Sequence, residues 1–117
     1  MTDHEERKGT DQKLLANPFS YNELVTYQEG SVVSRALIDK NEGTVTVFAF
    51  DAGQRLSTHS APFDALLEVI DGTGVITIDG RDYVMKSGQQ IIMPANHPHA
   101  VTAKERFKMV LIMIRAK

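Results

Sequence analysis

Short strand-forming segments separated by turn residues run through most of the chain, and they limit the fold to one class. Residues 31–38 and 44–51 are rich in β-branched and aromatic side chains, and the turn sequence Asn41-Glu42-Gly43 separates them. No segment has the length and period of a substantial helix. The pattern predicts an all-β sandwich or barrel. We expect the remaining strands at residues 65–70, 75–78, 83–85, 90–93, 99–102 and 107–114, with turns at Asp71-Gly72 and Asp79-Gly80.

Length and composition narrow the function classes. The chain has 117 residues, enough for one hydrophobic core. We expect residues 1–21 to form a polar, partly flexible arm, and residues 22–117 to form a single barrel domain.

The net charge of −2, with both signs interspersed, does not indicate a nucleic-acid partner. The absence of cysteine excludes disulfides and thiol catalysis. The sequence has no segment typical of a signal peptide or membrane span, so we expect a cytoplasmic protein.

Two histidines, His59 and His99, lie in glycine-punctuated patterns. The first pattern consists of Gly53, five residues, His59, then Ala61, Ala65 and Gly72; the second consists of Gly88, five residues, Pro94-Ala95-Asn96, two residues and His99. These patterns resemble the two signature motifs of the cupin superfamily, specifically its small single-domain members. The resemblance covers about Ser31 to the C-terminus. It implies a double-stranded β-helix (jelly-roll) barrel.

The same resemblance implies a degenerate metal-binding motif. In metal-binding cupins the first motif supplies two histidines and a glutamate or glutamine, and the second motif supplies a third histidine. Here Ala61 and Ala65 take the second histidine and carboxylate positions. Two imidazoles are too few for tight metal binding, which usually needs three or four protein ligands. We therefore expect His59 and His99 to hold a divalent metal (Zn, Ni, Cu, Fe or Mn) weakly or not at all, with His97 a less favoured third ligand.

Alternation along strands predicts which side chains line the barrel. Residues two apart point to the same side, so Ala61, Ala65, Leu67 and Val69 would continue the inner row from His59. Asp64 lies off that row, and we expect it to cap backbone amides. The candidate ligand-binding residues are His59, His99, Phe63, Phe48, Phe50, Met93 and Met109, with Met113 as a further wall residue. Alternatively, the apolar members are plain core, and the histidines are hydrogen-bonded residues without a ligand.

These residues favour a small-molecule-binding barrel protein, with the ligand held near the two histidines. The alternative is a cupin enzyme, either a metal-dependent oxygenase or an isomerase or lyase that uses His59 or His99 as general base. A third class is a structural or sensing scaffold. The sequence does not decide between an enzyme and a binding protein, and it assigns no catalytic residue.

The last predicted strand is apolar on both faces. Val110, Ile112 and Ile114 would face outward, and Leu66 and Ile70 repeat this pattern in the middle of the chain. Two outward apolar stripes predict that a second subunit covers one outer face, giving a homodimer. The alternative is that the N-terminal arm folds back over that face.

Overall fold

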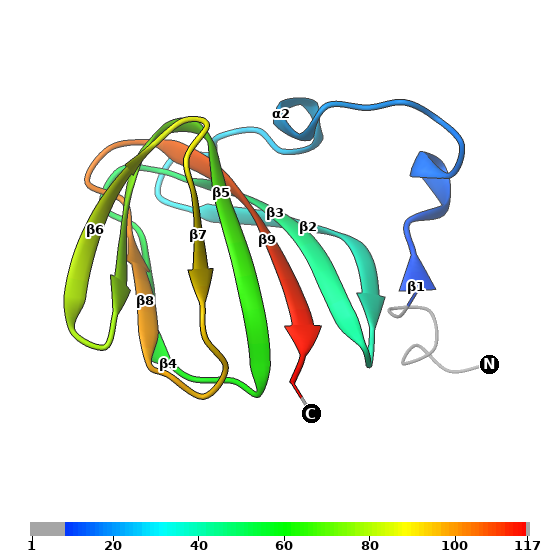
Figure 1. The fold of residues 1–117 in the computed structure, drawn as a ribbon. Coiled ribbons are helices and arrows are strands. Elements are labelled where there is room, and N and C mark those ends of the chain that lie inside the picture. Colours follow the sequence, from blue (N-terminus) through cyan, green and yellow to red (C-terminus); the bar gives the residue numbers. More distant parts are fainter. Residues whose placement is uncertain (1–8, 117) are drawn as a thin grey trace.

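The chain folds into an antiparallel β-barrel, which confirms the all-β prediction. The computed structural model describes residues 9–116 (Figure 1). No helix among them is long and apolar enough to cross a membrane. Its elements are β1 (Gly9–Thr10), η1 (Gln12–Leu14), α2 (Tyr21–Leu24), β2 (Val32–Lys40), β3 (Gly43–Phe50), β4 (Arg55–His59), β5 (Phe63–Ile78), β6 (Arg81–Lys86), β7 (Gln90–Met93), β8 (His99–Thr102) and β9 (Phe107–Arg115).

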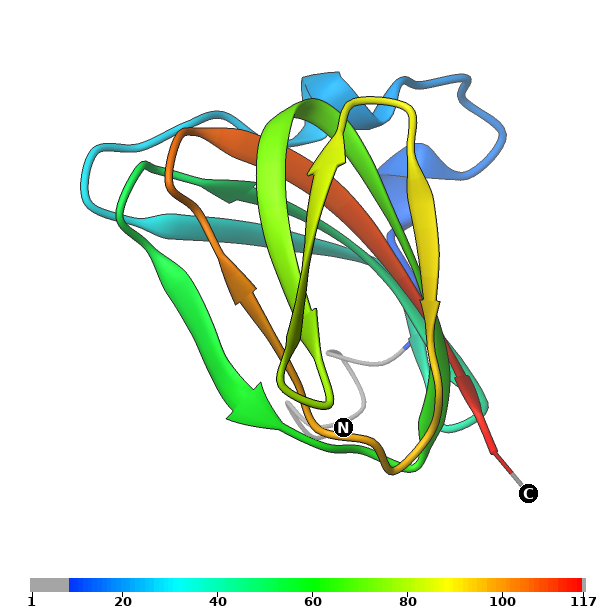
Figure 2. The ribbon, with the colours of Figure 1, turned by 60° about the vertical axis from the view of Figure 1, so that its left-hand side comes forward.

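Two walls face each other around one interior. The strand order is β1-β2-β3-β9-β5-β8-β4, and β6 and β7 also pair with β5. The first half of β5 pairs with β7 and β9, whereas its second half pairs with β6 and β8. Figure 2 shows the two walls curving around the interior, with β5 passing from one to the other. The long strand therefore joins the walls.

The prediction of two strands, residues 65–70 and 75–78, was wrong, because β5 is continuous from Phe63 to Ile78. Gly72 has a φ of 72°, and the register against β9 shifts between Val69 and Asp71. This bulge bends the strand without ending it. A Cβ on Gly72 would collide with the carbonyl oxygen of Arg106. The glycine that indicated a turn instead allows a close approach between strands.

The interior core is closed at one end by aromatic rings. Phe50, at the end of β3, stacks on Phe107, at the start of β9, with ring centroids 4.7 Å apart and 2° between planes. Phe48 stacks on Phe50 at 5.9 Å. Both Phe50 and Phe107 are fully buried, and each contributes about 1.5–3 kcal/mol through burial of its side chain. The core is therefore dense at this end.

Part of the outer face is covered by the N-terminal segment. Leu14, Tyr21 and Leu24 pack against a second buried cluster that includes Val47 and Val110. Over this part of the outer face, the N-terminal arm therefore folds back onto the barrel, as the alternative prediction stated. Side chains on both sides of the predicted boundary at residue 21 pack against this cluster, and the division into an arm and a barrel domain stays a prediction. Residues 1–8 of the predicted arm lie outside the described residues.

Tyr27 fastens this segment to the barrel. Its hydroxyl donates a hydrogen bond to the Asp71 carboxylate. Arg106 and Lys108 lie near the Tyr27 ring, with the guanidinium carbon and Nζ at 5.4 Å and 5.1 Å from the ring centroid. The Lys108 ammonium also donates to the carbonyl of Asn22 at 2.9 Å. Residues 22–27 are therefore held against β5 and β9.

Candidate functional site

The structure places His59 and His99 side by side. His59 ends β4 and His99 begins β8, and the two residues are paired across that antiparallel ladder. Their ring centroids are 4.4 Å apart, with 66° between the ring planes. A register shift between Leu56 and His59 lets these residues, three apart in sequence, both face the interior. His59 is exposed, whereas His99 is buried, at 9% of its full exposure.

Backbone carbonyls fix the orientation of both rings. The Nδ1 atom of His59 lies 2.9 Å from the carbonyl oxygen of Ser57, and that of His99 lies 3.2 Å from the carbonyl oxygen of His97. A carbonyl only accepts, so Nδ1 carries the hydrogen in each bonded ring. In the neutral imidazole this leaves Nε2 as an acceptor with a free lone pair.

His99 is held in its neutral form. Burial lowers the pKa of His99 below its ordinary value of 6.5, and the neighbouring charge of His59 lowers that pKa further. The hydrogen bond to the His97 carbonyl opposes these effects but does not outweigh them. At neutral pH the pair therefore presents a neutral His99 beside the ring of His59.

Both rings line an interior cavity of about 310 Å³. Its other lining residues are Phe48, Leu56, Leu67, Met93, Val101, Met109, Leu111 and Met113. The two imidazoles are the polar side chains in this set. Leu56, Val101 and Leu111 were not predicted, although Val101 lies two residues after His99 and Leu111 lies two after Met109. Strand alternation could have identified both of these.

Two of the methionines that line the cavity flank Ala65 in the sheet. This residue is paired with Met93 on one side and with Met113 on the other. Directly paired residues point to the same side of a sheet. Ala65 itself is buried, as its place on the predicted inner row requires.

Three predicted site residues lie outside the lining set. Phe50 belongs to the aromatic stack, where it is fully buried. Phe63 lies beneath Arg115, whose guanidinium carbon is 5.6 Å from the ring centroid. His97 points to a different partner: its Nδ1 lies 2.8 Å from Oδ2 of Asp79, and both side chains are about half exposed.

The donors in the described part of the chain do not fit a typical divalent-metal site. Residues 9–116 contain no group of three or more His, Cys, Asp or Glu side chains placed to hold a metal ion. Ala65 occupies the carboxylate position, and the nearby Asp64 binds a backbone amide instead. Its Oδ1 accepts a hydrogen bond from the Ala95 amide at 3.0 Å, which is the capping role predicted. Weak metal binding at the histidine pair stays a prediction.

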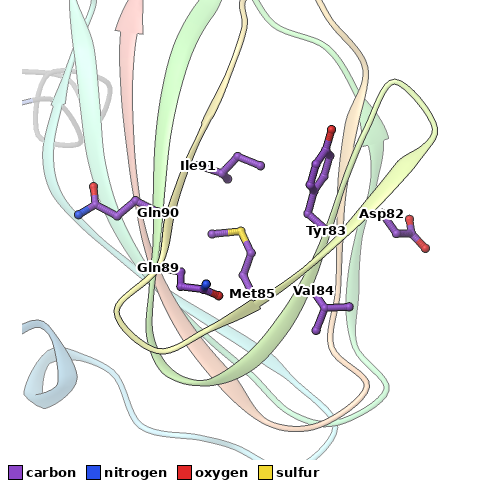
Figure 3. Close-up of a pocket in the computed structure, with 7 residues that line it drawn as sticks. All are labelled: Asp82, Tyr83, Val84, Met85, Gln89, Gln90 and Ile91. Carbon is purple, nitrogen blue, oxygen red and sulfur yellow. The ribbon is translucent and has the colours of Figure 1, made fainter.

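A second cleft, of about 420 Å³, lies between β6 and β7. These strands both pair with β5 and not with each other. Figure 3 shows Met85 and Ile91 pointing into the gap, while Asp82 and Gln90 point away from it. The Asp82 carboxylate already accepts a hydrogen bond from Thr77, at 2.6 Å. This cleft brings no cluster of titratable groups together, so the histidine-lined cavity is the candidate site.

The fold and the site define a small barrel of the double-stranded β-helix class, with a histidine pair facing its interior. The chain belongs to the cupin family, because the sequence profile of the Cupin domain matches residues 46–115. No curated protein matches the chain in sequence.

Solved structures share the fold across most of the chain. A conserved protein of unknown function from Streptococcus pyogenes is 35% identical, with a TM-score of 0.83 over 87% of this chain and 90% of its own. A Cupin 2 conserved barrel domain protein from Leptotrichia buccalis is 42% identical, with a TM-score of 0.83 over 85% of this chain and 48% of its own. A cupin superfamily protein from Desulfitobacterium hafniense is 28% identical, with a TM-score of 0.81 over 92% of this chain and 96% of its own.

Proposed function

We propose that the barrel binds a small organic molecule in its interior cavity, in hydrogen-bond contact with His59 and His99. The observation that carries this proposal is a pair of imidazoles with centroids 4.4 Å apart on the wall of an otherwise apolar cavity. Small-molecule sites typically combine an apolar lining with a few polar groups that orient the ligand.

The energetics of the pair support a bound ligand. The imidazole of His99 is buried, and its Nδ1 bond leaves Nε2 as the remaining acceptor. This Nε2 atom is not one of the fully buried polar atoms without a partner in residues 9–116, so it can be reached from the cavity. A ligand that donates a hydrogen bond to it would also bury the apolar lining, which favours binding.

An enzyme is the second candidate function. His99 is neutral at pH 7 because burial lowers its pKa, and a neutral imidazole with a free Nε2 suits a general base. This observation favours a metal-free isomerase or lyase. The donor set does not favour the metal-dependent oxygenase. We propose that any divalent metal is held weakly, and metal analysis of protein purified without an affinity tag tests this.

Native mass spectrometry of the purified chain tests ligand binding. We expect a co-purifying small molecule in the unmodified protein and its loss from the His59→Ala/His99→Ala double variant. His97→Ala is the matched control, because this histidine pairs with Asp79 outside the cavity. Equal retention of the molecule by the double variant would contradict the site. Circular dichroism of both variants establishes that they fold.

We also propose that a second copy of the chain covers the remaining outer apolar face. Ile92 on β7 and Ile114 on β9 are 68% and 63% exposed. With Leu66 and Ile112 they line a shallow apolar groove that the N-terminal segment does not cover. Exposed contiguous apolar surface of this kind is typical of protein interfaces. A symmetric dimer would pack this groove against its own copy.

A further inference from the structure

We propose that the cavity selects an uncharged, largely apolar molecule that carries a hydroxyl group, such as a phenol or a cyclic alcohol. This inference rests on the proposed function and adds the chemical class of the ligand. Three properties of the lining carry it: its charge, its hydrogen-bonding polarity and its depth.

The charge of the lining excludes ionic head groups. None of the cavity-lining residues has a permanently charged side chain. Two nearby carboxylates are engaged elsewhere: Asp79, in the turn after β5, pairs with His97, and Asp64, at the start of β5, binds the Ala95 amide. A carboxylate, phosphate or ammonium group in the cavity would lose its hydration without gaining a counter-charge. Acids and amines are therefore disfavoured.

The hydrogen-bonding groups of the lining favour a ligand that donates a hydrogen bond. Both Nδ1–H groups are taken by the carbonyls of Ser57 and His97. In its neutral form each ring then offers an acceptor at Nε2, and the other lining side chains offer neither strong donors nor strong acceptors. A ligand carbonyl or ether oxygen would find no donor there. A hydroxyl group would bind an imidazole lone pair.

The depth of the cavity sets the ligand's orientation and size. Phe48 and Met109 are paired across β3 and β9 at the side nearer the aromatic stack. His59 is exposed and marks the side open to solvent. We infer that the hydroxyl lies at the histidines and that the apolar body extends toward Phe48 and Met109. A volume of about 310 Å³ accommodates roughly ten water-sized groups, at ~30 Å³ each.

Four probes of similar size test the inference: phenol, toluene, benzoate and benzylammonium. Each is titrated into the full chain carrying ¹³C-methyl methionine, and binding is measured from the methyl resonances. Met93, Met109 and Met113 line the cavity, whereas Met85 lies in the same core but lines the second cleft. Met85 is thus an internal control for binding at this site.

We expect phenol to bind roughly two- to tenfold more tightly than toluene, the difference made by one net hydrogen bond. Benzoate and benzylammonium are expected to bind at least about tenfold more weakly than phenol. In the His59→Ala/His99→Ala variant the phenol affinity falls to that of toluene, and in His97→Ala it does not change. If the double variant does not fold, the wild-type ratios alone decide the inference.

Two kinds of failure are distinguishable. Equal affinities for phenol and toluene, or benzoate binding as tightly as phenol, would overturn the ligand class while leaving the cavity as a binding site. If no probe moves the three lining methyl resonances, the cavity does not admit small molecules, and the proposed function itself is wrong.

Discussion

The Asp64 carboxylate accepts a hydrogen bond from the Ala95 amide at 3.0 Å. The Asn96 amide adds a second bond between the same two segments, donating to the Ala61 carbonyl at 2.8 Å. One segment, residues 61–64, follows His59 and includes the start of β5, and the other precedes His99. The two bonds therefore hold together the segments that carry the histidine pair, although neither Asp64 nor Asn96 lines the cavity.

Replacing Asp64 with alanine removes the carboxylate that holds the Ala95 amide. We expect the free energy of unfolding to fall by about 1 kcal/mol, the typical net value of one hydrogen bond. Urea denaturation followed by circular dichroism measures the change. Asp64→Asn is the matched control, because its amide oxygen still accepts, and we expect it to retain most of the stability. Equal losses in both variants would contradict this role.

Gly72 and Gly88 both have positive φ, of 72° and 92°, but their surroundings differ. A Cβ at position 72 would strike the Arg106 carbonyl, whereas a Cβ at position 88 would meet nothing within 4 Å. We expect Gly88→Ala to cost about 1–2 kcal/mol from backbone conformation alone, and Gly72→Ala to cost more. Thermal and urea unfolding compare the two variants. Equal destabilisation would show that the strand contact at Gly72 relaxes freely.

The buried hydroxyl of Thr44 has no hydrogen-bond partner within residues 9–116. Thr44→Val replaces it with a methyl group of similar size, so we expect no loss of stability or a gain of up to about 1 kcal/mol. Thr77→Val is the matched control, because the Thr77 hydroxyl donates to Asp82 at 2.6 Å, and we expect it to lose about 1 kcal/mol. Chemical denaturation measures both. A clear loss in Thr44→Val would reveal a partner for its hydroxyl.

Burial lowers the pKa of His99 in the folded chain below its ordinary value of 6.5. Below pH 6.5 the unfolded chain therefore binds more protons than the folded chain at this residue, so acid favours unfolding. The contribution of neutral His99 to the free energy of unfolding is fully present above pH 6.5. It is lost as the pH falls through the pKa of His99 in the folded chain. We expect the stability of the wild type to fall more between pH 7 and pH 5 than that of His99→Gln. Parallel slopes in denaturation experiments would refute this.

A charge in the outer apolar groove is expected to break the proposed dimer. Ile114→Lys places an ammonium group where a second copy would pack, so we expect a monomer by sedimentation equilibrium. Val84→Lys is the control, because Val84 is 65% exposed but lies on β6, away from this groove. The dimer is contradicted if the unmodified chain sediments as a monomer at every concentration.

The sequence predicted most of the barrel because alternation and turn residues are local signals. The strands at residues 90–93 and 99–102 have the predicted bounds, and Ala65, Leu67 and Val69 are buried on one face, as predicted. Strand β4 was not predicted, because its residues Ser57 and Thr58 are exposed and break the apolar pattern.

The composition of the site was harder to predict, because it depends on register between distant strands. The shift between Leu56 and His59 changes which residues face inward, and no local pattern signals it. His97 lies two residues from His99, but the pairing with Asp79 takes its ring elsewhere. Phe50 alternates with Phe48, yet it stacks on Phe107, which lies far along the chain.

The continuity of β5 limits how the molecule can open. This single strand is bonded to β6, β7, β8 and β9, so neither half of the barrel can swing away while it stays intact. Any molecule that enters the cavity would then pass the exposed His59 side rather than parting sheets. For the same reason, heat or urea that releases β5 removes the support of both halves together, and we expect a single cooperative melting transition.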